Sequence, residues 1–504
     1  MKRTVVDLLA LLLACLMLFS GCFTLPDTEG NTTADPQTES IPNNEPEEPD
    51  AAPLHFEPIQ SGKYAVSIGD ASECEEIVIP DTYQGGQVCE IAQNGFANAK
   101  KLKKVVIGAN VSRIGENAFS GCSDLETVRL PQFLFAIGDS AFSDCTALKE
   151  VIFPFLSGWS YVGNRVFSGC TALESIQLPA DITMGREVFD GCENLTDVKL
   201  PERITLDSET FAGCPSAVET VDGISYVGCW VIACDESLTK AVLRAGTVGV
   251  AGDTFKNHQN LQEVTLSEGI KTMGSNSFSG CTSLTSVVLP DSLQTVGVNA
   301  FSDCSKLESV SFGKKIHTIS KGAFQNCASL KSVVLGDYAY AVCSDAFEGC
   351  TSLQSVDLGS VQVIESWAFA MCDSLKDVTI PDTVTSIGEY AFWSCKALKQ
   401  ISIGNGVTEI GRFAFGGCLS VTDLVLSSSL KNISRGVTNA AFYFKSNARI
   451  NLYFYGTQED WNAIRFQSRN DEVIEATRYY YSETQPTDTA GKYWHYVEGV
   501  PTAW

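Results

Sequence analysis

The sequence predicts a solenoid: a right-handed, β-dominated superhelix of parallel short strands and tight helical turns, with about 15 turns and a cap at both ends. Phenylalanine recurs every 22 or 23 residues, with one step of 25 and one gap of 44 that equals two intervals. A cysteine usually lies three residues after each of these phenylalanines. The recurring phenylalanines are Phe96, Phe119, Phe142, Phe167, Phe189, Phe211, Phe255, Phe278, Phe301, Phe324, Phe347, Phe369, Phe392 and Phe415. Because every turn repeats one structural task, the pattern disfavours an enzyme.

Residues 114–131 show the content of one turn. The order is Ile114-Gly115, Ala118-Phe119, Cys122, Leu125, Val128 and Leu130-Pro131. Alternation of polar and apolar residues around Val128 predicts a short strand, which the proline ends. The Ala-Phe-x-x-Cys stretch is too short for a full helix and predicts a tight helical or 3₁₀ turn. Stacked turns should bury the phenylalanines in one continuous core, where each ring contributes roughly 1.5–3 kcal/mol.

Twelve of the 19 cysteines occupy the position three residues after a repeat phenylalanine. They are Cys122, Cys145, Cys170, Cys192, Cys214, Cys281, Cys304, Cys327, Cys350, Cys372, Cys395 and Cys418. Equivalent positions in neighbouring turns lie about 4.8 Å apart with parallel side chains, whereas disulfides need facing Cβ atoms about 3.5–4.5 Å apart. We expect a ladder of buried thiols, with some bridging as the alternative. Ala99 and His258 replace two of the ladder cysteines, so no catalytic role fits the position.

Two cysteine pairs fall outside this ladder. Cys74 and Cys89, and likewise Cys229 and Cys234, could each form a local disulfide or remain unpaired. The sequence has no Cys-x-x-Cys pair, which leaves zinc and redox sites of that type without support. The four histidines are far apart in sequence, and a solenoid keeps distant residues apart. We therefore predict no metal site, no cofactor and no catalytic residue.

The first 53 residues predict export and tethering. Lys2 and Arg3 precede a short apolar run, which is typical of a signal peptide at 1–22 and not of a membrane span. The small residues before Cys22 resemble a bacterial lipobox, which implies that Cys22 is lipidated and that the chain is anchored at the outer face of the membrane. The alternative is an ordinary secreted protein cleaved nearby. Residues 23–53 contain acidic residues but no Lys or Arg, and predict a disordered tether.

The rest of the chain can be divided into segments that follow the repeat pattern more or less closely. Residues 54–100 are expected to form an N-terminal cap and the first repeats, and residues 101–440 the solenoid proper. Residues 215–254 lose much of the repeat pattern, which favours degenerate repeats. The alternative is a segment that departs from the repeat in order to bind a partner. Residues 441–504 are rich in aromatic residues and predict a C-terminal cap unit. Its tyrosines and tryptophans could pack as the core of that cap or bind sugars or partners.

Each predicted strand should point two side chains outward, so that the turns together form two columns on one broad face. The first column is Thr127, Glu150, Ser175, Asp197, Glu263, Ser286, Ser309, Ser332, Ser355, Asp377, Gln400 and Asp423. The second is Arg129, Ile152, Gln177, Lys199, Thr265, Val288, Ser311, Val334, Asp357, Thr379, Ser402 and Val425. These small and mildly acidic residues suit a protein ligand contacted over a wide area better than a small molecule in a pocket. An inert, solvated sheet is the alternative.

The net charge of −25 disfavours nucleic acid and anionic lipid as direct partners. The membrane would then be reached through the lipid anchor only. Simple solubility of an exposed protein explains the charge equally well.

The frame carried by Ile114-Gly115, Ala118-Phe119, Cys122, Leu125, Val128 and Leu130-Pro131 resembles the BspA-like leucine-rich-repeat family of bacterial surface proteins. The resemblance covers about residues 60–440, and residues 452–504 resemble a C-terminal unit that often follows such repeats. It implies a leucine-rich-repeat solenoid on the cell surface. Some members of this family adhere to host matrix proteins, host cells or other bacteria, but no binding motif transfers residue by residue.

These observations lead to a main hypothesis and an alternative. The main hypothesis is a non-enzymatic, monomeric surface lipoprotein that binds a protein or glycan ligand on a host or bacterial surface, with adhesion as the outcome. The alternative is a glycan-binding or cell-envelope-processing lipoprotein that uses the C-terminal aromatic unit. A scaffold without a ligand of its own would have the same sequence features.

Overall fold

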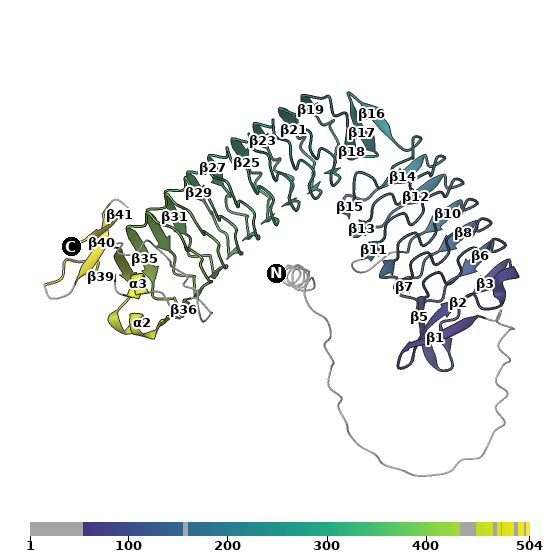
Figure 1. Ribbon diagram of the computed structural model, residues 1–504, viewed down its shortest axis with the longest axis horizontal. Coiled ribbons are helices and arrows are strands. Elements are labelled where there is room, and N and C mark those ends of the chain that lie inside the picture. Colours follow the sequence, from purple (N-terminus) through teal and green to yellow (C-terminus); the bar gives the residue numbers. More distant parts are fainter. Residues whose placement is uncertain are drawn as a thin grey trace, which may run out of the picture. The chain divides into compact units, whose positions relative to one another are not determined.

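The computed structural model describes residues 54–154, 160–433, 450–466, 471–474, 476–487, 492–497 and 500–504. The expected signal peptide, lipidation site Cys22 and tether lie outside the described residues. The described chain forms a parallel-strand β-solenoid of about 17 stacked turns, which confirms the predicted fold class (Figure 1). In that part of the chain, none of the helices combines the length and the apolar character that a membrane span requires.

Each regular turn contains two strands, where the sequence predicted one. The predicted strand has three or more residues. A second strand of two or three residues ends in most turns at an apolar residue, such as Ile114 in Arg113–Ile114 or Met273 in Thr272–Met273. A two-residue strand is too short to produce a recognisable alternation in the sequence. The turns are therefore held together by two ladders of parallel strands.

The ladder of predicted strands carries the broad face. Its N-terminal strands are β3 (Glu76–Val78), β6 (Lys104–Val106), β8 (Thr127–Arg129), β10 (Glu150–Ile152), β12 (Ser175–Gln177) and β14 (Asp197–Lys199). It resumes with β19 (Lys240–Val242), β21 (Glu263–Thr265), β23 (Ser286–Val288), β25 (Ser309–Ser311), β27 (Ser332–Val334) and β29 (Ser355–Asp357). It ends with β31 (Asp377–Ile380), β33 (Gln400–Ile403), β35 (Asp423–Ser427), β37 (Asn451–Tyr455), β39 (Thr477–Tyr481), β40 (Tyr493–Val497) and β41 (Val500–Ala503).

The second ladder lies along another side of the turns. Its first sheet contains β1 (His55–Gln60), β2 (Lys63–Ser67), β4 (Thr82–Tyr83), β5 (Gly86–Ile91), β7 (Arg113–Ile114), β9 (Ala136–Ile137), β11 (Ser160–Val162), β13 (Ile182–Met184) and β15 (Ile204–Thr205). Its second sheet contains β16 (Glu219–Val221), β17 (Ile224–Val227), β18 (Trp230–Cys234), β20 (Gly249–Val250), β22 (Thr272–Met273), β24 (Thr295–Val296) and β26 (Thr318–Ile319). It continues through β28 (Ala341–Val342), β30 (Val363–Ile364), β32 (Ser386–Ile387), β34 (Glu409–Ile410), β36 (Asn432–Ile433) and β38 (Arg465–Phe466).

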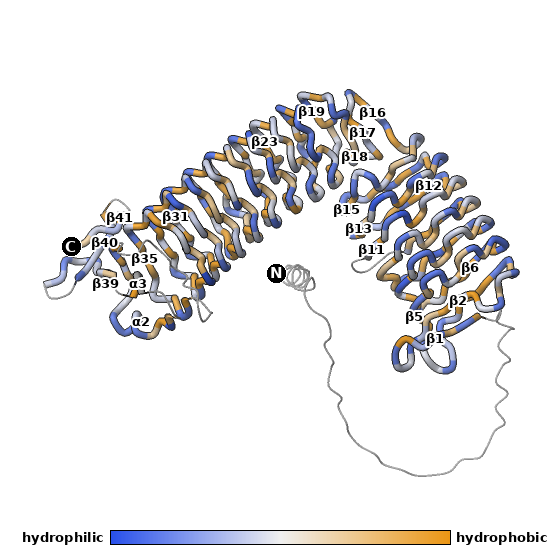
Figure 2. Tube along the Cα trace, viewed as in Figure 1, coloured by the Kyte–Doolittle hydropathy of each residue, from blue (hydrophilic) through white to orange (hydrophobic). Residues whose placement is uncertain are grey.

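The phenylalanine rings form the predicted core. Neighbouring rings from Phe96 to Phe211 stack with centroids 5.1–5.6 Å apart. A second stack runs from Phe255 to Phe415, with centroids 4.6–5.3 Å apart. All of these rings are buried. Hydrophobic and hydrophilic stretches alternate along the chain through the turns (Figure 2).

The twelve ladder cysteines are buried, free thiols, as the sequence predicts. Each thiol donates a hydrogen bond to the main-chain oxygen of the phenylalanine one turn earlier. Cys122 contacts Phe96 at 3.1 Å and Cys327 contacts Phe301 at 3.2 Å. The thiols thus contribute to the contact between successive turns. Cys74, Cys89, Cys229 and Cys234, whose pairing the sequence left open, are also free.

The Ala-Phe-x-x-Cys stretch forms a tight turn, with the main-chain N–H of Cys122 bonded to the oxygen of Phe119 at 3.2 Å. Left-handed residues on both sides keep this turn from extending into a helix. Asn117 has φ 55° and Gly121 has φ 73°, a conformation that Asn and Gly adopt at little cost. A Cβ on Gly121 would lie 2.7 Å from Oδ1 of Asn98 in the previous turn, so this glycine also allows close stacking.

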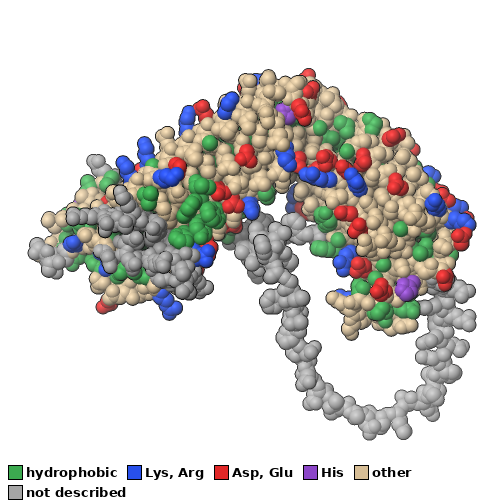
Figure 3. Space-filling view, viewed as in Figure 1, with side chains coloured by type: hydrophobic (Ala, Val, Ile, Leu, Met, Phe, Trp, Pro, Cys, Tyr) green, Lys and Arg blue, Asp and Glu red, His purple; other side chains and the backbone are tan. Residues whose placement is uncertain are grey.

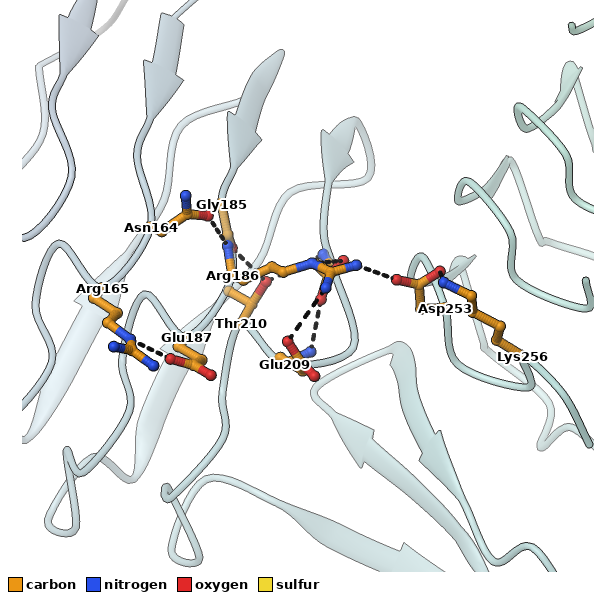
Figure 4. A network of polar contacts seen from close by, with 10 residues as sticks. Asn164, Arg165, Gly185, Arg186, Glu187, Glu209, Thr210, Asp253 and Lys256 are labelled. Atoms are coloured by element: carbon orange, nitrogen blue, oxygen red, sulfur yellow. Dashed lines mark hydrogen bonds and ion pairs between the residues drawn. The ribbon is translucent and has the colours of Figure 1, made fainter.

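The two phenylalanine stacks meet at a junction between Phe211 and Phe255. Here β16, β17 and β18 form an antiparallel unit in the region that the sequence marks as degenerate. The chain then returns to the first stack, where Asp207 and Gly252 form a parallel bridge. The Arg186 guanidinium pairs with Asp207 at 3.4 Å. It also pairs with Asp253, as Figure 4 shows. This network joins residues far apart in sequence across the junction.

The helices of the described chain are short and lie near its ends. They are a 3₁₀ helix at Ala71–Glu73, α2 (Gln458–Ala463) and α3 (Asp471–Ile474). The helix α2 buries Trp461. Thr457 and Asp460 cap it reciprocally: the Asp460 N–H donates to the Thr457 hydroxyl at 3.2 Å, and the Thr457 N–H donates to the Asp460 carboxylate at 2.8 Å.

Candidate functional site

The first column of the broad face is an aligned row of exposed side chains. Its members occupy the first position of β8, β10, β12, β14, β21, β23, β25, β27, β29, β31, β33 and β35. Parallel pairing sets neighbouring members opposite one another, as for Ser286 with Ser309 and Ser332 with Ser355. All are exposed except Gln400 and Asp423, which are half-buried. The strands therefore position these side chains rigidly, and a partner could contact several turns at once.

The second column is exposed along most of its length but ends differently from the prediction. Val288 and Val334 are 65% and 59% exposed, so isolated apolar groups face solvent among polar ones. Val425, expected to point into solvent, is buried. It packs with Tyr453 and Trp494 of the C-terminal strands, which cover this end of the face. No local pattern around Val425 could have revealed that cover, because it comes from residues far downstream.

The structure adds three turns that the sequence columns omitted. Glu76 and Lys104 extend the first column toward the N-terminus and form an ion pair at 3.6 Å. Lys240 lies in register with Glu263 and pairs with it at 2.8 Å. Burial alternates along these three strands, but their outward third position holds an exposed valine, Val78, Val106 or Val242. No polar-apolar alternation therefore marked them in the sequence.

Two hollows make the N-terminal half of the broad face concave. One of about 710 Å³ spans β6, β8 and β10 and includes Lys104, Arg129 and Glu150 in its lining. The other, of about 430 Å³, spans β10, β12 and β14 and includes Ser175, Asp197 and Lys199. Charges of both signs occur in both hollows. Figure 3 likewise shows acidic and basic side chains interspersed over the visible surface.

A stack of aromatic residues marks another edge of the C-terminal turns. Trp367, Tyr390 and Phe413 occupy successive turns at the left-handed position that Asn117 holds, with φ 62°, 58° and 50°. The Trp367 and Tyr390 ring centroids lie 4.3 Å apart, and the ring of Trp393 meets Trp367 edge-on at 5.7 Å. Bulky residues are uncommon in this conformation, which costs roughly 1–2 kcal/mol per residue. The stacking contacts offset part of that cost.

The cysteines and histidines do not assemble a reactive centre in the described chain. His258, in a ladder position, has its Nε2 3.6 Å from the Sγ of Cys234. Burial raises the pKa of Cys234 to about 12, so a neutral thiol, not a nucleophilic thiolate, faces the imidazole at neutral pH. Among the described residues there is no group of three or more His, Cys, Asp or Glu side chains that could hold a metal ion.

The comparison with protein families decides the classification. The family model described as "BspA type Leucine rich repeat region" matches residues 89–218, 233–343 and 318–449. The match contains 6 copies of the repeat and covers more than half of the chain. The chain belongs to this family. The match confirms the resemblance that the Ala-Phe-x-x-Cys frame indicated. No curated protein sequence matches the chain.

Solved bacterial leucine-rich-repeat structures resemble this BspA-type chain. A protein from Bacteroides ovatus is 25% identical over 79% of this chain and 98% of its own, with a TM-score of 0.39. A protein from Eubacterium ventriosum is 20% identical over 66% and 90%, with a TM-score of 0.35. A leucine-rich cell surface protein from Faecalibacterium prausnitzii is 19% identical over 84% and 98%, with a TM-score of 0.25. Because these TM-scores are low, the family assignment rests on the repeat match.

Proposed function

We propose that this BspA-type protein is a non-enzymatic, monomeric surface lipoprotein whose broad face binds a macromolecular partner in adhesion to host proteins, host cells or other bacteria. The observation that carries the proposal is the row of exposed side chains held in register on parallel strands, as in Ser286–Val288 paired with Ser309–Ser311. Solenoids commonly bind partners along such extended surfaces.

The chemistry of the face favours a protein partner over nucleic acid. Acidic residues outnumber basic ones in the first column and the turns that extend it, and the whole chain has a net charge of −25. The acidic residues are Glu76, Glu150, Asp197, Glu263, Asp377 and Asp423, and the basic ones are Lys104 and Lys240. A phosphate backbone would be repelled by this surface. Small serines between the carboxylates allow close approach of a partner, while Val288 and Val334 add apolar contacts at the centre of the face.

Attachment follows from the N-terminal sequence. In this proposal the signal peptide is removed, Cys22 is lipidated, and residues 23–53 connect the anchor to the solenoid. Mass spectrometry of the protein from a bacterial membrane fraction would test the anchor. A diacylated N-terminal Cys22 supports it, and an intact or differently cleaved N-terminus contradicts it.

Binding by the broad face can be tested with two matched quadruple variants. The first carries Ser286→Arg, Ser309→Arg, Ser332→Arg and Ser355→Arg, all in the first column. The control carries Thr282→Arg, Ser305→Arg, Ala328→Arg and Thr351→Arg, which adds the same charge in the same turns just after the ladder cysteines. The full chain would be titrated against immobilised fibronectin, fibrinogen, laminin, collagen and whole bacterial cells.

The wild type and the control should bind at least one of these surfaces with similar affinity, and the first variant at least 10-fold more weakly. Absence of binding by the wild type to every surface would contradict the proposal. Equal binding by the two variants would place the interaction elsewhere on the molecule and would also contradict it.

A further inference from the structure

A separate hollow lies where the broad face meets the C-terminal unit. It has a volume of about 390 Å³ and is formed by the ends of β31 and β33, the turns that follow them, and Val425 in the middle of β35. Tyr455 of β37 and Tyr496 of β40 complete its lining. The site thus combines repeat strands with the aromatic unit, and its size falls within the range of about 300–1,000 Å³ of small-ligand pockets.

The polar groups of this hollow are held by the turns of the solenoid. The main-chain N–H of Asn405 donates to Oδ1 of Asp382 at 2.6 Å, which orients the carboxylate. The side chains of Thr379, Ser402 and Asn405 also line the hollow. Among its described lining residues there is neither Lys nor Arg. The site therefore offers hydrogen bonds without a positive charge, so a neutral ligand suits it better than an anionic one.

The aromatic wall is supported from behind. Trp494 is fully buried and donates its indole N–H to the main-chain oxygen of Phe454 at 3.2 Å. The ring of Tyr496 packs edge-on against Trp494, with centroids 4.9 Å apart. The ring of Tyr455 stacks on Tyr481 at 4.2 Å. Tyr496 is nevertheless 46% exposed, so its ring is both fixed and accessible.

Both phenols keep their protons at neutral pH. Burial is the largest cause that raises the pKa of Tyr455 and of Tyr496, and the carboxylate of Asp382 raises that of Tyr496 further. Their hydroxyl groups can therefore donate as well as accept hydrogen bonds. Each phenol offers an apolar ring together with a polar tip.

We propose that this hollow binds one sugar unit of a neutral glycan. A pyranose has an apolar C–H face that can lie against a tyrosine ring, while its hydroxyls bond to a carboxylate, an amide and other hydroxyls, which are the groups that Asp382, Asn405 and Ser402 provide. The hollow is open to solvent, so the glycan chain can extend out of it. The hollow shares Thr379 and Ser402 with the second column of the broad face, but glycan binding here does not depend on protein binding by the rest of that face.

Isothermal titration of the full chain with cellohexaose, chitohexaose and laminarihexaose would test the site, with a heparin hexasaccharide as the anionic probe. At least one neutral hexasaccharide should bind. Tyr496→Ala and Asp382→Ala should each weaken that binding at least 10-fold, and Tyr496→Phe only a few-fold, because the ring remains. The control Tyr338→Ala removes a tyrosine that is 58% exposed and lies outside the hollow, so it should bind as the wild type does.

The proposal fails if no neutral hexasaccharide binds, if only the heparin probe binds, or if Tyr496→Ala binds as the wild type does. Asn405→Ala changes another, exposed residue of the lining and decides the question if Tyr496→Ala does not fold. Titration of Tyr496→Ala against the protein surfaces separates the two proposals, because loss of glycan binding alone leaves the broad-face interaction intact.

Discussion

The thiol of Cys281 lies 3.1 Å from the main-chain oxygen of Phe255, to which it donates a hydrogen bond across one turn. The same contact recurs along both stacks, so each ladder cysteine fills a small apolar space and also satisfies a buried carbonyl. The abundance of cysteine in this chain is thereby explained without disulfides or chemistry.

Cys327→Ala should lower the free energy of unfolding by about 1–2 kcal/mol, because it removes a buried sulfur and the bond to Phe301. The cost stays moderate since the Phe301 oxygen also accepts from the Cys304 N–H. Urea denaturation would measure the change, with the exposed Ser311→Ala as a control. A variant as stable as the control would show that the thiol contributes little.

Stability should fall steeply above about pH 9. Burial raises the pKa of Cys350 from an ordinary value of 9.0 to about 12, so between these values the unfolded chain loses a proton that the folded chain keeps. Each such thiol then destabilises the fold by about 1.4 kcal/mol per pH unit. Urea midpoints from pH 8 to 10.5 would show the decline. Cys350→Ala should give a shallower decline; a curve parallel to that of the wild type would refute this account.

Among the cysteines that the structure describes, iodoacetamide should label Cys229 first in the native protein. Cys229 is exposed, whereas Cys122 and the other ladder thiols are buried, and burial raises the pKa of Cys122 to about 12. Peptide mapping after brief treatment should find the ladder peptides unmodified, and all of them modified after denaturation. Rapid labelling of ladder peptides without denaturant would contradict the structure.

Phe324→Ala should destabilise the fold by about 3–5 kcal/mol, since this buried ring stacks at 5.3 Å on both Phe301 and Phe347. The control Phe133→Ala removes a ring that is 65% exposed and should change stability by no more than about 0.5 kcal/mol. Urea denaturation compares them. Similar losses in both variants would mean that the stacked rings are not the main source of stability.

Met371→Asn should stabilise the protein by up to about 1 kcal/mol. Met371 has φ 57° at a position where most other turns carry glycine, asparagine or aspartate, such as Gly121, Asn326 and Asp303, and asparagine adopts this conformation at lower cost. Thermal unfolding would reveal the gain as a higher Tm than that of Met371→Ala, which lacks the local hydrogen bonding of asparagine. The opposite order would show that methionine contributes packing that outweighs the backbone strain.

The features that the sequence predicted are those that recur with the period of the turn. Phe119, Cys122 and Val128 each repeat often enough for their burial to be inferred from spacing alone. The second strand escaped prediction because two residues such as Arg113–Ile114 carry too little pattern. The antiparallel unit β16–β18 escaped because it occurs only once among the described residues, in a region where the period fades.

The candidate sites divide in the same way. The exposed column through Ser309 follows directly from alternation on a short strand. The glycan site does not, because Asp382 and Tyr496 are 114 positions apart in sequence and meet only when the C-terminal strands extend the last sheet. The spacing of the repeats cannot predict contacts between a repeat and a cap that does not follow the repeat pattern.

The uniform contact from Phe278 to Phe301 to Phe324 has an evolutionary consequence. If one repeat were duplicated or deleted among these turns, the turns that then became adjacent would make the same phenylalanine contacts as before. Over evolution, a protein of this kind can gain or lose surface by whole repeats without other substitutions in its core. The ion pairs of Arg186 limit where a repeat can be gained or lost. A repeat added or removed between Arg186 and Asp253 would move these two residues apart and break their ion pair.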